Sequence, residues 1–367
     1  MAVVCGDHDR TMYLASFIAS YSSQLEVCGS ASKGSFLRLT QPCTKGSVLL
    51  SVPMSSCLCS WDVSDKALEA LHPEPMAPLR LALLTAGYSR TEYFSRAAPL
   101  EVFSCHMASW PDASVAAEWA GPSLAWRRVG GWRQELRREW QRLRQAGIEV
   151  TEEQHLWAAL VVQTRALGGS GENLTLCPGI DLCNHVSVGQ TARVKIQEHA
   201  VELVAEYSME AGQEVTINYG PDADFLDLFE AFGFFDSTSV IHTVEVEIPL
   251  STMLSDQEWR RDIIMAAAEQ GYDEVFEAWW VPDFAVTGCP LWVAARAMFV
   301  DQKELPQGSL EEQRLALKRP IRREIDVRAW LAQILRQQLE RYPDLGKGQS
   351  EPGSPEENRL WLLIWWI

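Results

Sequence analysis

The chain has 367 residues, with 32 Lys and Arg against 49 Asp and Glu, and a formal net charge of -17. Its length and composition are typical of a globular protein with one large domain or two. The acidic excess argues against a surface that binds nucleic acid, because such a surface needs Lys and Arg to neutralise phosphates. A basic protein partner suits this charge better, and an acidic surface that only keeps the protein dissolved is the alternative.

Nine cysteines are scattered without a CxxC pair or a zinc-finger spacing, so we expect reduced thiols and no metal site. Reduced thiols favour the cytoplasm or the nucleus. Charged residues at positions 7 to 10 precede only a short apolar run, which indicates neither a signal peptide nor a membrane-spanning helix, and we expect no membrane association. A weakly marked organellar transit segment stays open.

The first predicted elements are two short strands, 36–39 and 48–52, on either side of a turn at 44–46. From residue 61 to about 167 the periodicity is helical, with interruptions by prolines. An apolar stripe at helical spacing predicts an amphipathic helix there: Trp132, Leu136, Trp140 and Leu143. Thr151 and Gln154 have the spacing of a capping box, which predicts that the next helix starts here and runs to Leu167.

The segment from Leu176 to Phe235 holds two polar signatures within apolar surroundings, Asn184-His185 and Asn218-Tyr219-Gly220. Strands are predicted at 192–197, 201–207 and 215–219, and a helix at 224–231. Buried amides and imidazoles cost free energy unless they have partners, so these groups need internal hydrogen bonds or a ligand. Taken singly, Asn184, His185 and Tyr219 are better explained as a turn asparagine, a satisfied buried histidine and a core tyrosine.

After a strand at 241–248, the pattern becomes helical at 257–269, 273–279, 291–299 and 325–341. We place a domain boundary near 249. Residues 346–357 read as a linker, and the apolar residues 360–367 are too few to cross a bilayer. No phosphate-binding GxxxxGK, zinc-binding HExxH or GxSxG nucleophile motif occurs in the chain.

Several segments, in one order, resemble the SET-domain methyltransferases of the branch that contains the Rubisco large-subunit methyltransferase. The resemblance covers roughly residues 24 to 343. Its segments are KGSVLLSVP (45–53), WAALVVQTR (157–165), LCPGIDLCNH (176–185), AGQEVTINYG (211–220), FGF (232–234), LWVAARAMF (291–299) and RYP (341–343).

The resemblance implies an α+β protein, a SET-type β-clip of short sheets with an inserted helical region, followed by an all-α C-terminal domain. The SET domain would span 24–248 with its helical insertion at about 61–167. The helical substrate-binding domain would span 249–343, and 344–367 would be a linker and an apolar tail. The implied activity is methyl transfer from S-adenosylmethionine to a lysine of a protein substrate.

The resemblance also implies roles for particular residues. Tyr219 matches the catalytic tyrosine, and the carbonyl groups of Thr164 and Asp181 would contact the target amine and the migrating methyl. The implied cofactor-binding residues are Ser32, Lys33, Gly34, Arg165, Asn184, His185, Tyr219 and Phe232. Such a reaction depends on alignment and on a deprotonated amine, which an apolar channel beside a positive sulfonium favours.

The chain departs from the family's pattern at two places. The glycine-rich loop, usually GRGL, reads Ser32-Lys33-Gly34-Ser35, and the segment after Gly220 lacks the usual asparagine. Two alternatives therefore stand beside the lysine methyltransferase. One is methyl transfer to a protein histidine, and the other is a catalytically silent SET-like module that binds a protein partner.

Overall fold

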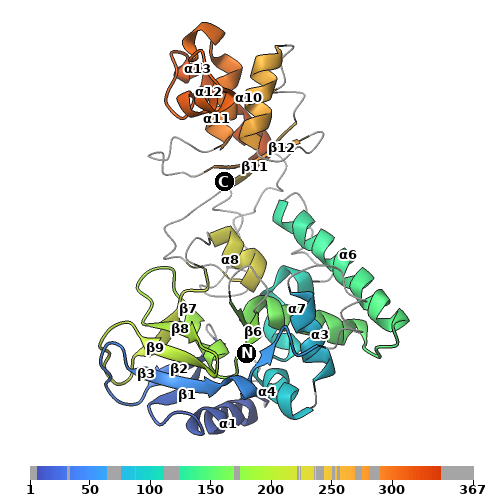
Figure 1. Ribbon diagram of the computed structural model, residues 1–367, viewed down its shortest axis with the longest axis vertical. Helices are drawn as coiled ribbons and strands as arrows, with labels where there is room; N and C mark the ends of the chain where they lie inside the picture. Colours follow the sequence, from blue (N-terminus) through green and yellow to red (C-terminus); the bar gives the residue numbers. More distant parts are fainter. Residues whose placement is uncertain are drawn as a thin grey trace, which may run out of the picture. The chain divides into compact units, whose positions relative to one another are not determined.

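The computed structural model describes residues 6–30, 34–63, 76–86, 88–110, 124–168, 174–220, 223, 225–234, 236, 244–249, 253, 257–268, 275–280 and 290–339. The chain forms two compact units, the first within residues 1–240 and the second mainly Ile241–Ile367 (Figure 1). Among the described residues, no helix is long and apolar enough to span a membrane.

The first unit contains three small sheets. One has the order β1-β2-β10-β7, a second β3-β9-β8 and a third β4-β6-β5. The strands are β1 (Leu25–Ser30), β2 (Gly34–Leu39), β3 (Val48–Pro53), β4 (Leu58–Cys59), β5 (Ala166–Leu167), β6 (Thr175–Leu176), β7 (Asn184–His185), β8 (Ala192–Ile196), β9 (Ala200–Ala205) and β10 (Glu214–Ile217). All strand pairs are antiparallel except β7 with β10.

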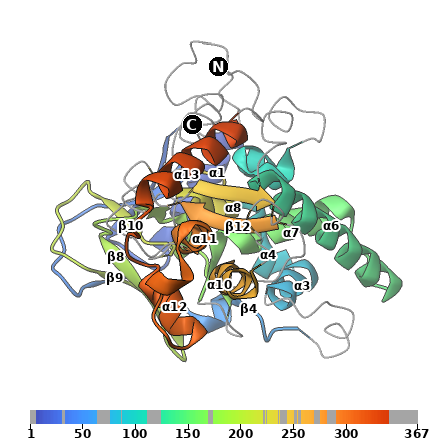
Figure 2. The same cartoon turned by 90° about the horizontal axis from the view of Figure 1, so that it is seen from above.

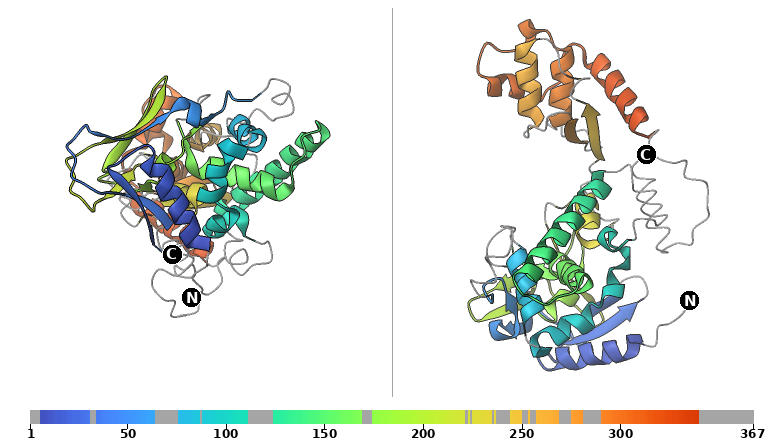
Figure 3. Two further views of the ribbon diagram at one scale, coloured as in Figure 1. Left: turned by 90° about the horizontal axis from the view of Figure 1, so that it is seen from below. Right: turned by 90° about the vertical axis from the view of Figure 1, so that its right-hand side faces the viewer.

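Helices accompany these sheets in the first unit. They are α1 (Gly6–Ala19), α3 (Ala77–Thr85), α4 (Tyr88–Ala97), α6 (Leu124–Gln145), α7 (Glu152–Arg165) and α8 (Phe225–Phe232). In Figures 1 and 2 the sheet with β8 and β9 lies on one side of this unit, and α3, α6 and α7 lie on the other. Helix α1 packs along β1 (Figure 3). Its side chains Leu14 and Ile18 are completely buried.

A buried ionic network joins three of these helices. Arg80 of α3 donates to both carboxylate oxygens of Glu139 of α6, at 2.6 and 3.2 Å, and Nε2 of His155 of α7 lies 2.9 Å from Oε1 of the same carboxylate. All three side chains are at most 4% exposed. Burial alone raises the pKa of Glu139, but the hydrogen bonds from His155 and Arg80 outweigh it and hold the pKa at about 2.

The second unit has its own hydrophobic core. Its elements are β11 (Val244–Pro249), α10 (Glu258–Ala268), β12 (Val275–Trp280), α11 (Pro290–Phe299), α12 (Leu310–Ala316) and α13 (Glu324–Leu339). Helix α11 is central to that core, because Leu291, Ala294 and Ala295 are at most 1% exposed within one apolar cluster. Arg296 on the same helix pairs with Glu324 of α13 at 2.7 Å.

Most predicted elements are present. The predicted α+β fold with short sheets is confirmed, and the capping box of Thr151 and Gln154 starts α7, with both of its hydrogen bonds formed. The helix predicted at Asp273–Trp279 is wrong, because Val275–Trp280 form strand β12 against β11. These residues are rich in β-branched and aromatic side chains, which fit a paired strand. The second unit is therefore not all-helical. Helix α1 was not predicted from the sequence. The predicted linker and tail at 344–367 lie outside the described residues.

We expect Glu139→Gln to lower the free energy of unfolding by about 3–5 kcal/mol, because it leaves the Arg80 guanidinium buried without its charge partner. Glu135→Gln is the matched control on the same helix. Its carboxylate is 53% exposed in an ion pair with Arg138, so we expect a change within about 0.5 kcal/mol. Denaturant unfolding measures both, and equal effects would contradict the role of the network.

The same network predicts a pH dependence. Since the pKa of Glu139 is lowered from 4.5 to about 2, its contribution to stability is complete above pH 4.5 and is lost as the pH falls toward 2. The difference in stability between the wild type and Glu139→Gln should therefore shrink over this range. A constant difference would show that ionised Glu139 is not the stabilising species.

Candidate active site

The two polar signatures meet where β7 runs parallel to β10. Asn184 lies beside Thr216 and His185 beside Ile217 in this pairing, and the backbone N–H of Val186 donates to the carbonyl of Ile217 at 3.1 Å. Because β10 continues directly into Tyr219, the pairing brings residues about thirty positions apart into contact. The side chain of Asn218 closes the same crossing by donating to the carbonyl of Ser187 at 3.1 Å.

Tyr219 is fixed at both its backbone and its hydroxyl. Its backbone N–H donates to Nδ1 of His185 at 3.0 Å, and its hydroxyl donates to the carbonyl oxygen of Cys183 at 2.7 Å. Both bonds reach back to the segment that carries Asn184. The orientation of the phenol is therefore set by the strand crossing.

The surroundings of Tyr219 and His185 keep the phenol and the imidazole uncharged. Burial raises the pKa of Tyr219 well above its ordinary value, while the Arg165 cation opposes the rise. Burial lowers the pKa of His185, and the carboxylate of Asp236 opposes that shift. Because Nδ1 of neutral His185 accepts from Tyr219, its Nε2 carries the proton and can donate to Oγ of Ser187, 3.0 Å away.

Aromatic rings from the end of α8 pack on Tyr219. The ring centroids of Phe232 and Phe234 lie 4.8 and 6.1 Å from that of Tyr219. Gly233 between them has φ +79°, and a Cβ at this position would lie 2.9 Å from Cα of His106. Glycine is thus required both by the left-handed backbone and by the close approach of another segment.

A second polar cluster flanks the tyrosine. Nη1 of Arg165, the last residue of α7, donates to the carboxylate of Asp181 at 2.8 Å and to its carbonyl at 3.0 Å. The other carboxylate oxygen accepts from Tyr93 at 2.7 Å and from the backbone of Gly179 at 2.9 Å. In the part of the chain that the structure describes, Nε of Arg165 is buried and has no hydrogen-bond partner.

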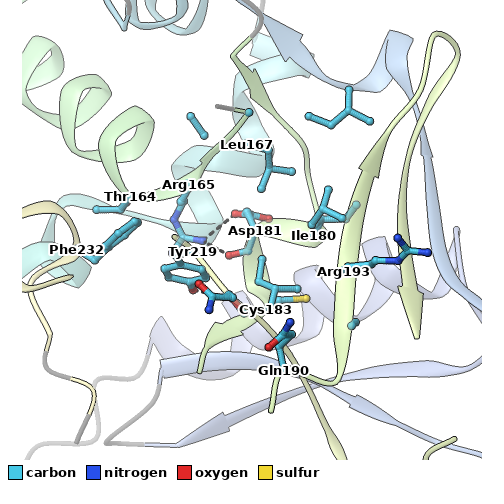
Figure 4. Close-up of a pocket in the computed structure, with 17 residues that line it drawn as sticks. Thr164, Arg165, Leu167, Ile180, Asp181, Cys183, Gln190, Arg193, Tyr219 and Phe232 are labelled. Atoms are coloured by element: carbon cyan, nitrogen blue, oxygen red, sulfur yellow. Dashed lines mark hydrogen bonds and ion pairs between the residues drawn. The ribbon is translucent and has the colours of Figure 1, made fainter. Parts of the chain in front are cut away.

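These groups enclose a cavity of about 470 Å³ (Figure 4). The figure shows Arg165 joined to Asp181, with Tyr219 beside them and with Cys183 and Gln190 below them in this view. The lining residues are Thr164, Arg165, Ala166, Leu167, Gly168, Ile180, Asp181, Cys183, Gln190, Ala192, Arg193, Val194, Ile196, Ile217, Asn218, Tyr219 and Phe232.

The cavity unites part of the predicted site. Thr164, Arg165, Asp181, Tyr219 and Phe232 all line it. The other predicted residues do not line the cavity. Asn184 donates to Glu214 at 2.8 Å, the His185 side chain clamps Tyr219, Gly34 is exposed with φ +67°, and Ser32 and Lys33 lie outside the described residues.

Sequence reasoning missed two parts of the site. One is Tyr93, which holds the carboxylate of Asp181 from a helix far away in the chain and follows no local pattern. The other is the wall formed by Ala192, Val194 and Ile196. Their alternating spacing in a predicted strand places them on one face, which is the signal that could have revealed this wall.

Comparison with known proteins agrees with this geometry. No family model matches the chain. The chain is 26% identical over 244 residues to SET domain-containing protein 8 of Schizosaccharomyces pombe (strain 972 / ATCC 24843), an alignment that covers 60% of this chain and 56% of that protein. The chain thus spans just over half the length of this curated relative.

Solved structures match over almost the whole chain. The structure of Rubisco LSMT bound to AdoMet has a TM-score of 0.69 at 16% identity, covering 99% of this chain and 88% of that one. Rubisco LSMT bound to sinefungin and monomethyllysine also has a TM-score of 0.69, at 15% identity and 97% and 87% coverage. The chain has a SET-type α+β fold. With its C-terminal helices, this fold is similar to that of the Rubisco LSMT structures.

Gly233→Ala should lower the free energy of unfolding by more than about 2 kcal/mol, because the new Cβ adds a backbone clash to the strain of a positive φ. Gly189→Ala is the matched control, since Gly189 has φ +80° but no atom within 4 Å of the position of its Cβ. We expect about 1 kcal/mol there. Equal losses in denaturant unfolding would show that the approach of His106 is not tight.

Proposed function

We propose that the chain is an S-adenosylmethionine-dependent methyltransferase that acts on a lysine amine of a protein substrate. The observation that carries this proposal is the placement of Tyr219. Its hydroxyl is held by the strand crossing at the wall of a cavity that also contains Thr164, Arg165 and Asp181. The related structures, which hold AdoMet, AdoHcy or sinefungin and in several cases a lysine, support the same assignment.

The side chains of Arg165 and Asn184 fit the amino-acid end of the cofactor. The buried Nε–H of Arg165 needs an acceptor, which a carboxylate provides. Oδ1 of Asn184 accepts no hydrogen bond from the described residues while its Nδ2 is bound to Glu214, so it is available to an ammonium group. We therefore assign Asn184 and Arg165 to hold the cofactor, with the backbone of His185 and the aromatic face of Phe232 completing its site.

The part of the cavity lined by β8 and the end of β10 fits the target side chain. Its wall includes Ala192, Val194 and Ile217, which suit the aliphatic stem of a lysine. Since the Tyr219 hydroxyl donates its hydrogen bond to the carbonyl oxygen of Cys183, the lone pairs of the phenol oxygen can accept a hydrogen bond from the target amine. The raised pKa of Tyr219 means that the phenol orients the amine and does not act as a base at neutral pH.

The chemistry places few further demands on the protein. When bound, S-adenosylmethionine would supply an electrophilic methyl group on a sulfonium, with S-adenosylhomocysteine as the leaving group. The amine must first lose a proton, and removal from water lowers its pKa. The carbonyl groups of Thr164 and Asp181 would accept weak C–H hydrogen bonds from this methyl group. The protein contributes mainly alignment.

Tyr219→Phe should reduce methyl transfer by at least roughly 100-fold, because the hydroxyl that orients the amine is lost. The measurement is incorporation of labelled methyl into protein from a lysate. Tyr207→Phe is the control, since Tyr207 is 53% exposed and outside the cavity, and it should keep wild-type turnover. Unchanged turnover in folded Tyr219→Phe would refute the assignment of Tyr219.

The identity of the methylated residue is tested on the same labelled product. Acid hydrolysis followed by amino-acid analysis separates methyl-lysine from methyl-histidine. We expect label only in methyl-lysine, and label in methyl-histidine would replace the proposed acceptor with the alternative one.

A further inference from the structure

The ion pair between Arg165 and Asp181 uses only one of the two carboxylate oxygens. Nη1 of Arg165 donates to Oδ2 of Asp181 at 2.8 Å and to its backbone carbonyl at 3.0 Å (Figure 4). Arginine and carboxylate groups commonly pair through two parallel N–H···O bonds, because the guanidinium donors match the two carboxylate oxygens. The Asp181 side chain is fully buried, so solvent does not explain why the second bond is missing.

Other donors occupy the second carboxylate oxygen. The hydroxyl of Tyr93 donates to Oδ1 of Asp181 at 2.7 Å. The backbone N–H of Gly179 lies 2.9 Å from this oxygen and 2.9 Å from the Tyr93 hydroxyl. Two short hydrogen bonds use the acceptor capacity of Oδ1. The carboxylate is therefore held so that Oδ2 alone faces Arg165.

Tyr93 is fixed in the position from which it holds Asp181. The residue is 3% exposed, and its ring centroid lies 4.7 Å from that of Phe17 in α1 and 5.2 Å from that of Phe94. Burial and the negative charge of Asp181 raise the pKa of Tyr93 well above its ordinary value. The hydroxyl thus keeps its proton and remains a donor to the carboxylate.

This arrangement leaves donors of Arg165 available at the cavity. Arg165 lines the cavity, and its Nε is buried without a hydrogen-bond partner among the described residues. A buried donor without an acceptor costs free energy, which a second bond to Asp181 would recover. Because Tyr93 and Gly179 hold Oδ1, the guanidinium cannot turn toward the carboxylate to make that bond.

We propose that Tyr93 is a positioning residue that keeps the Arg165 guanidinium available to the carboxylate of the cofactor. The inference rests on the proposed function, because it takes S-adenosylmethionine as the ligand. Tyr93 is not among the residues that line the cavity, so it acts through Asp181. When the hydroxyl is removed, the Asp181 carboxylate turns toward Arg165 and takes a second N–H from the same guanidinium.

A purely structural role of Tyr93 leads to a different expectation. Looser packing around Tyr93 would weaken the binding of every ligand of the cavity to a similar extent. Competition for Arg165 weakens only ligands that carry a carboxylate. Decarboxylated S-adenosylmethionine separates the two roles, since it keeps the adenosine, the sulfonium and the ammonium group and lacks only the carboxylate.

The first test is calorimetric titration of Tyr93→Phe and the wild type with both ligands. We expect the Kd for S-adenosylmethionine to rise roughly ten-fold in Tyr93→Phe, and the Kd for the decarboxylated ligand to change by less than about two-fold. The variant should fold, because the phenyl ring keeps its packing and the N–H of Gly179 keeps Oδ1 as its acceptor. Thermal unfolding checks this.

Tyr21→Phe is the matched control. Tyr21 belongs to the same aromatic group, with its ring centroid 5.1 Å from that of Phe17, but its hydroxyl lies 3.2 Å from Oγ of Ser56 and not at Asp181. Both Kd values should stay at the wild-type level in this variant. Equal losses for the two ligands in Tyr93→Phe, or no loss for either, would overturn the positioning role.

The second test needs no change at Tyr93. In wild-type protein labelled with ¹⁵N in its arginines, the Nε–H signal of Arg165 is assigned by its absence in Arg165→Lys. We expect S-adenosylmethionine to shift this signal and to slow its exchange with solvent, whereas the decarboxylated ligand does neither. An Nε–H signal that responds alike to both ligands would overturn the proposal, because Tyr93 would then have no donor to keep available.

The two proposals fail in different ways. If folded wild-type protein binds neither ligand, the proposed function is wrong. If the wild type binds S-adenosylmethionine and transfers its methyl group, but Tyr93→Phe affects both ligands alike, the proposed function stands and the role of Tyr93 is wrong.

Discussion

The parallel pairing of β7 with β10 is the constraint on which the candidate site depends. It brings the segment after Pro178 against the end of β10, and it lets His185 and Cys183 hold the backbone and hydroxyl of Tyr219. Parallel neighbours need a long connection, which β8 and β9 provide as a hairpin. Strand β8 of that connection also forms a wall of the cavity, so the same hairpin permits the parallel pairing and shapes the site.

Buried polar groups around this crossing are almost all satisfied within the protein. Asp181 alone accepts from Tyr93, Gly179 and Arg165, which fixes the carbonyl proposed to face the reacting atoms. Such a network holds a site rigid before any ligand arrives. The buried Nε of Arg165 is an exception, and an unmet donor in an otherwise satisfied network indicates where a ligand belongs.

Local patterns predicted the longer strands β3, β8 and β9 and the capped helix α7, because these elements carry strong periodicity and turn signals, whereas α1 and β1 were not predicted. The resemblance, and not the periodicity, grouped Thr164, Arg165 and Tyr219, which the structure places in one cavity. Tyr93 could not be predicted, since its contact with Asp181 depends on tertiary packing across the unit. In the second unit, aromatic residues at 275–280 suit a helix or a strand by sequence, and pairing with β11 decides for the strand.

The most direct measurement of the central claim is calorimetric titration of the folded chain with S-adenosylmethionine. The account predicts a single saturable site with micromolar affinity, despite the departure from the glycine-rich pattern at Ser32. It also predicts that Asn184→Ala weakens this binding at least roughly ten-fold, since one hydrogen bond to a charged group is lost. Absence of binding to well-folded wild-type protein would contradict the account and favour a silent SET-like module.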